Sequence, residues 1–166
     1  MASEPHLLII WHSRTGASEA MARAAFAGAG GGHDGSARLL RADEACADDL
    51  LGAAVYLFVC PENLGALSGL MKEFLDRTYY DALGRIEGRG YASIIAAGSD
   101  GTGAERQLDR IVTGWRLRRI ADPMIVNCHA QTPEAIAAPK QISDKILKSC
   151  HDLGEALAEG ARLGLF

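Results

Sequence analysis

The segment Leu-Leu-Ile-Ile-Trp-His-Ser-Arg-Thr-Gly-Ala-Ser, residues 7–18, joins a short apolar run to a loop of small and hydroxyl-bearing residues. An alanine-rich stretch, residues 17–27, follows directly. This order predicts a buried strand, a loop and then the start of a helix. Main-chain N–H groups at a helix start have no acceptor within the helix, and with nearby hydroxyls they bind phosphate without a metal ion. The loop offers three hydroxyl groups and a glycine that permits close approach: Ser13, Thr15, Ser18 and Gly16.

Further apolar runs rich in branched or aromatic residues predict four more strands. They span residues 37–41, 54–60, 91–97 and 120–126. Apolar residues at helical spacing predict five helices, within residues 17–27, 43–51, 67–75, 108–115 and 142–157. Continuous apolar strands that alternate with helices are typical of a parallel sheet covered on both faces. We therefore expect an α/β fold with a doubly wound, five-stranded parallel sheet in a single domain, residues 1–166.

The composition argues against several classes of partner. The formal net charge is -4, so a basic surface for nucleic acid or anionic lipid is not expected. No apolar run approaches the roughly 20 residues of a membrane-spanning helix, and residues 1–6 lack the basic and apolar regions of a signal peptide. The four cysteines form no Cys-x-x-Cys pair, and the five histidines show no paired metal spacing. We expect a cytoplasmic protein with reduced thiols, without membrane insertion or a metal site.

Two further loops directly follow predicted strands. One is Pro-Glu-Asn-Leu-Gly-Ala-Leu-Ser, residues 61–68, and the other is Gly-Ser-Asp-Gly-Thr-Gly, residues 98–103. Ligands of a doubly wound sheet bind beyond the carboxyl ends of the strands, where the strand order reverses. The loop at 12–18 is therefore expected to face the other two across one site.

Other phosphate and nucleophile motifs do not fit. There is no Walker run Gly-x-x-x-x-Gly-Lys-(Ser/Thr), and the glycine-rich segment 28–32 follows a predicted helix where a dinucleotide fingerprint follows a strand. Cys60 ends a predicted strand, but the residue six positions later is Ala66, where a thiol phosphatase needs arginine. A response-regulator receiver would have an aspartate at the position of Cys60 or Pro61.

The spacing at Ser13, Thr15, Gly16 and Ser18 resembles the (Thr/Ser)-x-Thr-Gly-x-(Thr/Ser) loop with which flavodoxin-like proteins hold the phosphate of FMN. The second loop, with Pro-x-x-x-Gly and then Lys-x-Phe-Leu-Asp-Arg at residues 72–77, looks like that of NAD(P)H-dependent FMN reductases and small quinone reductases. The resemblance implies the strand order 2-1-3-4-5 and FMN as cofactor. It also implies that the second loop runs along the isoalloxazine edge.

The resemblance implies a cofactor site without a catalytic side chain. Its members are Ser13, Arg14, Thr15, Gly16, Ala17, Ser18, Pro61, Glu62, Asn63, Leu64, Gly65, Ser99, Asp100 and Gly101. Several side chains in or beside these loops have more than one possible role. Arg14 either contacts the phosphate or is solvated, and His12 either borders the phosphate or lies on the surface. Asp100 turns outward, caps the following helix or bonds a ribityl hydroxyl, and Ser68 serves as a helix N-cap, a flavin contact or both.

The expected function is an FMN-dependent oxidoreductase that passes hydride from NADH or NADPH to the flavin and on to a quinone, a flavin or another small acceptor. The second and third loops contain no Trp, Tyr or Phe, which leaves a flavin face open for stacking by a nicotinamide. The alternatives are a flavodoxin-type electron carrier and a binding module without flavin. Enzymes of this type imply a homodimer or homotetramer, with the helix that carries Trp115 and the connection 127–140 as expected interface elements.

Overall fold

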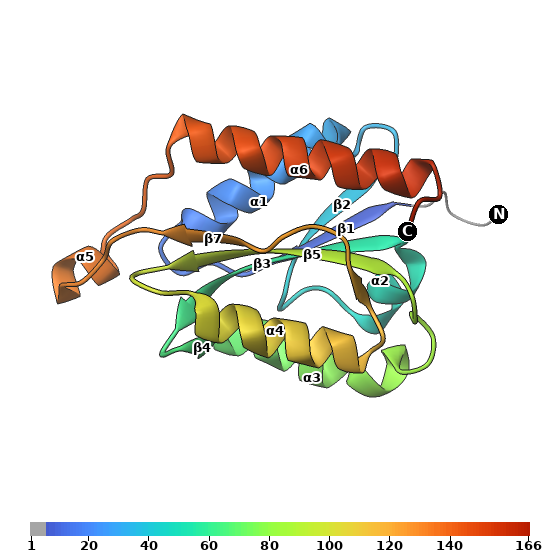
Figure 1. The fold of residues 1–166 in the computed structure, drawn as a ribbon, viewed down its shortest axis with the longest axis horizontal. Helices are drawn as coiled ribbons and strands as arrows, with labels where there is room; N and C mark the ends of the chain where they lie inside the picture. The colour runs from blue at the N-terminus through green and yellow to red at the C-terminus, as the bar shows by residue number, and fades with distance from the viewer. Residues whose placement is uncertain (1–5) are drawn as a thin grey trace.

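The computed structural model describes residues 6–166 as a central sheet between two layers of helices (Figure 1). Residues 1–5, part of the stretch assessed above for a signal peptide, lie outside the described residues. The strands are β1 (Leu7–Trp11), β2 (Ala37–Arg41), β3 (Val55–Asn63), β4 (Ala66–Leu67), β5 (Gly90–Ala97), β6 (Arg118–Arg119) and β7 (Met124–Asn127). The helices are α1 (Ala17–Gly28), the 3-10 turn η1 (Gly30–Gly32), α2 (Ala47–Gly52), α3 (Gly69–Ala82), α4 (Thr102–Gly114), α5 (Pro133–Ala137) and α6 (Asp144–Arg162).

The main strands are parallel and run in the order β2-β1-β3-β5-β6. At the carboxyl end of β1, Trp11 lies opposite Arg41 of β2 and Val59 of β3. On the other side of β3, Val59 lies opposite Ile94 of β5. The strand order reverses between β1 and β3, so the loops that leave these strands lie side by side. This arrangement confirms the predicted parallel α/β sheet and the 2-1-3 part of its order.

The predicted count of five strands is wrong, because the sheet formed by residues 6–166 has seven. The expected strand 120–126 is split into β6 and β7, which pair with opposite ends of β5. Pro123 lies between them and has no N–H to donate to a ladder, which explains the interruption. The additional β4 forms a hairpin with the end of β3.

The predicted helices are present with shifted bounds, and α5 is an element that the sequence did not predict. Helix α2 begins at Ala47 and not near residue 43, since the Asp49 carboxylate accepts a hydrogen bond from the Cys46 N–H at 2.9 Å. Trp115, expected on an interface helix, lies just after α4 and is 1% exposed. It packs in the core and is unavailable to a partner. Within residues 6–166, no helix combines the length and the apolarity that crossing a membrane requires.

Two apolar clusters hold the layers together. One packs α2, α3 and α4 against one face of the sheet, and the other packs α1 and α6 against the opposite face. The strands β1 and β5 are buried along their whole length, in agreement with their mainly apolar sequences; Ser93 of β5 is the buried polar exception, and its hydroxyl accepts a hydrogen bond from Arg119 at 3.2 Å.

Helices α1 and α6 are in main-chain contact at two points. The cause is a pair of glycines: Gly28 lies against the main chain of His151, and Gly154 lies against the main chain of Ala25. A Cβ at either glycine would overlap a carbonyl group of the facing helix. Because main-chain atoms cannot rotate away, a larger residue would force the helices apart.

We predict that Gly154→Ala lowers the free energy of unfolding by about 1–3 kcal/mol, the usual range for overpacking in a core. Gly114→Ala is the matched control, since its Cβ would meet nothing within 4 Å. The control should be neutral or slightly stabilising. Urea denaturation of both variants measures the difference, and equal stabilities would contradict the proposed clash.

Candidate functional site

The loop after β1 turns into α1 at Gly16, whose φ of 97° is in the left-handed region. The Ser13 hydroxyl accepts a hydrogen bond from the Gly16 N–H at 3.1 Å and stabilises the turn. No side chain of the described residues caps the start of α1. The first N–H groups of α1 therefore have no partner from the helix or from a capping side chain.

Ser18, in the first turn of α1, has a buried hydroxyl without a partner. The residue is 1% exposed, and its Oγ forms no hydrogen bond within the described chain although it lines the cavity discussed below. A buried hydroxyl without a partner is costly. Its position beside unpaired N–H groups at a helix start fits an anion such as phosphate.

The predicted second loop, residues 61–68, is in part a β-hairpin. Strand β3 continues to Asn63 and pairs with β4, and the turn between them consists of Leu64 and Gly65 with φ values of 54° and 73°. Two successive positive φ angles are the geometry of the tight turn that suits a two-residue hairpin. Leu64 lies at the tip, and its side chain is fully exposed.

Glu62 binds the start of α4. Its carboxylate accepts hydrogen bonds from the N–H groups of Gly101 at 2.9 Å and Ala104 at 3.0 Å. Asp100 accepts bonds from the Thr102 N–H at 3.4 Å and from the Thr102 hydroxyl at 2.8 Å. This bond pattern matches the capping reading of Asp100. The N-terminus of α4 is thus supplied with carboxylates, and the hairpin is fixed to it.

His12 is buried, contrary to the surface alternative, and it does not line the cavity described below. Its Nδ1 lies 2.8 Å from the hydroxyl of Ser68, which is fully buried. Burial lowers the pKa of His12, and the nearby Arg14 adds to this effect. The Ser68 hydroxyl forms no cap bond to α3, although Ser68 occupies the N-cap position. This contact joins the loop after β1 to the start of α3.

Cys60 lies next to Ser68 and is fully buried. Burial raises the pKa of its thiol to about 12, and hydrogen bonds from Ser68 only partly offset this. The thiol is therefore protonated at neutral pH and inert as a nucleophile. This agrees with the rejection of a thiol phosphatase.

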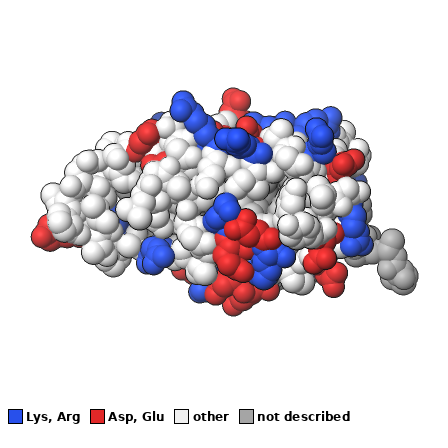
Figure 2. All heavy atoms as spheres, turned by 90° about the horizontal axis from the view of Figure 1, so that it is seen from below, with Lys and Arg blue, Asp and Glu red and all other residues white. Residues whose placement is uncertain are grey.

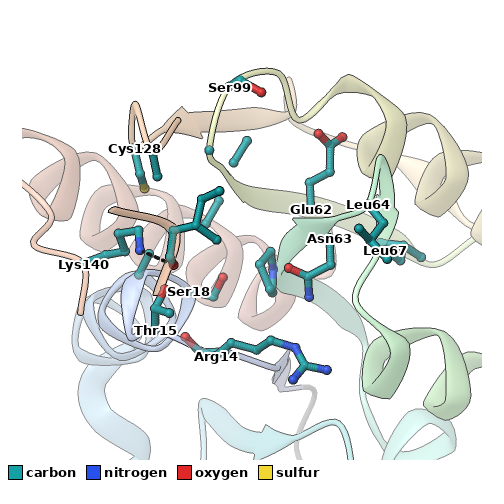
Figure 3. Close-up of a pocket in the computed structure, with 18 of the residues that line it drawn as sticks. Arg14, Thr15, Ser18, Glu62, Asn63, Leu64, Leu67, Ser99, Cys128 and Lys140 are labelled. Atoms are coloured by element: carbon teal, nitrogen blue, oxygen red, sulfur yellow. Dashed lines mark hydrogen bonds between the residues drawn. The ribbon is translucent and has the colours of Figure 1, made fainter. Parts of the chain in front are cut away.

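These loops enclose a cavity of about 830 Å³ at the carboxyl edge of the sheet (Figure 3). All the predicted site residues line it except Gly16, Asp100 and Gly101. Gly16 shapes the turn behind the lining, while Asp100 and Gly101 belong to the capped start of α4. In Figure 3, Thr15 and Ser18 lie on one side of the cavity, and Asn63 and Leu64 lie on the other.

A fourth wall of the cavity was not predicted as part of the site. It consists of residues from the connection between β7 and α6: Cys128, Ala130, Ile136 and Lys140. The main-chain N–H of Lys140 donates to the Thr15 carbonyl at 2.7 Å, and that of Ala130 donates to the Gly98 carbonyl at 2.9 Å. The sequence did contain an indication of this wall. The connection follows a predicted strand and therefore begins at the same edge of the sheet as the other loops.

Outside this cavity, the exposed side of α6 brings together His151, Asp152 and Glu155. Lys148 already binds the Asp152 carboxylate, with its Nζ 2.7 Å from Oδ1. None of the three lines the cavity. Exposed acidic groups of this kind are common without a metal ion.

No protein-family model matches the chain. The chain is similar to a flavodoxin from Aquifex aeolicus (strain VF5), with 29% identity over 158 residues, covering 92% of this chain and 85% of that protein. Its structure resembles a flavodoxin from the domain Archaea, with a TM-score of 0.74 and 17% identity, covering 95% of this chain and 99% of that one. It also resembles the flavodoxin, WrbA-like protein from Agrobacterium tumefaciens, with a TM-score of 0.67 and 18% identity, covering 96% and 99%. The chain therefore has the flavodoxin-like fold.

We predict that Glu62→Ala loosens the hairpin from α4. Removing both acceptors leaves the N–H groups of Gly101 and Ala104 without partners, which should cost about 1–2 kcal/mol of stability. Hydrogen exchange at these two amides should accelerate. Asp100→Ala is the control, because Asp100 binds only Thr102. Unchanged protection of both amides in Glu62→Ala would contradict the assigned role of Glu62.

Proposed function

We propose that the protein binds FMN, with the phosphate at the start of α1. The observation that carries this proposal is the buried Ser18 hydroxyl, which lacks a partner among residues 6–166 and lies beside uncapped helix N–H groups. A phosphate would satisfy both. The cavity volume of about 830 Å³ lies within the usual range of roughly 300–1,000 Å³ for small-molecule sites.

The residues that would hold the cofactor come from all three predicted loops. Thr15 and Ser18 would bind the phosphate, while Asn63 to Gly65 and Gly98 to Ser99 line the remainder of the same cavity and would face the ring system. Bound FMN supplies hydride and single-electron transfer. The main chain of the hairpin is held by Glu62, so its polar groups are positioned before any ligand binds.

We further propose that the protein is an NAD(P)H-dependent oxidoreductase that delivers hydride to a quinone, a flavin or a similar small acceptor. None of the described residues that line the cavity is aromatic. Within residues 6–166, no aromatic side chain is therefore placed to stack on a flavin in this cavity, and a nicotinamide ring would have room to do so. The likeness to the WrbA-like protein is compatible with this proposal.

The charge distribution also favours a small-molecule partner. On the face shown in Figure 2, acidic and basic side chains are interspersed over α3 and α4, and the end that carries α5 is mostly uncharged. Pairs such as Lys72 with Asp76 and Arg77 with Glu73 neutralise each other along α3. A carrier that docks by electrostatic attraction would need a field of one sign.

The alternative is an electron carrier that does not itself oxidise NAD(P)H. The names of the Aquifex aeolicus relative and of the archaeal structure, both flavodoxins, favour it. For the enzyme, we propose a homodimer or homotetramer in the cytoplasm. The connection 127–140 would contact the neighbouring subunit there, because it projects from the body of the protein and exposes Ile136 beside the cavity.

We predict that Gly16→Asp weakens FMN binding by at least about tenfold. The φ of 97° at this position is unfavourable for a residue with a Cβ, and the added carboxylate repels the phosphate. Gly84→Asp is the matched control. Gly84 also has a positive φ, of 74°, but a Cβ there meets nothing within 4 Å and the residue does not line the cavity. Titration of flavin fluorescence with each protein measures the affinity. Equal affinities in the two variants would refute the phosphate assignment.

We predict that the FMN-loaded protein, under anaerobic conditions, loses its yellow absorbance when NADH or NADPH is added, and regains it when a quinone follows. Loss of absorbance with dithionite, but with neither nucleotide, would favour the carrier. Protein that stays colourless after incubation with FMN would contradict both functions. The remaining alternative would then be a binding module that does not use flavin.

A further inference from the structure

The connection between β7 and α6 is tied to the start of α1. It leaves the sheet at its carboxyl edge, carries α5 away from the body of the molecule and returns to α6 (Figure 1). On the return, the main-chain N–H of Lys140 donates to the Thr15 carbonyl at 2.7 Å. This bond sets the Lys140 backbone against the loop that precedes α1.

The Lys140 side chain is held in place by its own segment. Its Nζ donates to the carbonyl groups of Ile136 at 2.9 Å and Ala138 at 2.6 Å. A lysine ammonium has three N–H donors, so one remains after these two bonds. Lys140 lines the cavity, and Figure 3 shows it beside Thr15 and Ser18. The remaining donor is therefore available to a ligand at the start of α1.

Among the charged residues near the start of α1, Lys140 is the cation directed toward Thr15 and Ser18. Arg14 is exposed, and in Figure 3 its side chain extends away from Thr15 and Ser18, toward the side of Asn63. Glu62 is bonded to the start of α4. Glu19, in the first turn of α1, pairs with Arg23 at 2.8 Å. Within residues 6–166, no carboxylate forms an ion pair with Lys140.

We propose that Lys140, and not Arg14, supplies the positive charge that selects a phosphorylated flavin over the same flavin without phosphate. This inference rests on the proposed FMN site. The unpartnered Ser18 hydroxyl and the third N–H of the Lys140 ammonium would bind the same phosphate group from opposite sides. The connection between β7 and α6 thereby becomes part of the binding site and determines its specificity.

The test compares FMN with riboflavin, which differs only in lacking the phosphate. Each is titrated into apoprotein of the wild type and of Lys140→Ala, Lys140→Arg, Arg14→Ala and Lys148→Ala, with thermal melting to verify folding. We expect Lys140→Ala to weaken FMN binding about tenfold, as for loss of a charge-assisted hydrogen bond, and to leave riboflavin binding unchanged. Lys140→Arg should retain most of the affinity, and Arg14→Ala should lose less than Lys140→Ala. Lys148 is the control because it lies on α6, pairs with Asp152 and does not line the cavity.

Three results would overturn the inference. One is unchanged FMN affinity in Lys140→Ala, and another is a larger loss in Arg14→Ala. The third is an equal loss for FMN and riboflavin, which would show that Lys140 only supports the connection. In all three, the wild type still binds FMN and the proposed function stands. A wild type that binds neither flavin would instead refute the proposed function together with this inference.

Discussion

The parallel pairing of β1 with both β2 and β3 is the constraint on which the site depends. It places β1 inside the sheet, where both of its faces are buried, and it aligns Trp11 with Arg41 and Val59 at one edge of the sheet. Because every main strand points the same way, each segment that follows a strand emerges at this edge. Four segments far apart in the sequence thus line one cavity.

Two helices begin at this edge with nearly the same geometry, and they differ in what satisfies their N–H groups. Gly16 before α1 has φ 97° and ψ -16°, and Gly101 before α4 has φ 91° and ψ -15°. Glu62 supplies acceptors to α4 from the hairpin. Helix α1 receives none from a capping side chain of the described residues, and the Ser18 hydroxyl beside it also lacks a partner. One helix start is thus used to position the hairpin, and the other remains open to an anion.

Most of the support around the cavity is polar and long-range. Glu62 reaches α4, His12 reaches Ser68, and the N–H of Lys140 reaches Thr15. These contacts hold the turns at the edge of the sheet in fixed relative positions. Preorganised main-chain groups suit a cofactor that carries its own reactivity, since the protein then has only to bind and orient it.

The sequence by itself determined the α/β class, the strands β1, β2 and β5, and the segments that form most of the cavity. These features depend on local apolar periodicity and on turn residues such as Gly16, which act over a few positions. Only the tertiary structure decided the features that depend on distant partners. The Glu62 carboxylate turns to α4, and His12 is buried against Ser68, 56 residues away. Lys140 joins the site through Thr15, although 125 residues separate them (140 minus 15). The bonding partners of polar groups depend on which segments the packed sheet brings together, and the local periodicity of the sequence does not specify these long-range neighbours.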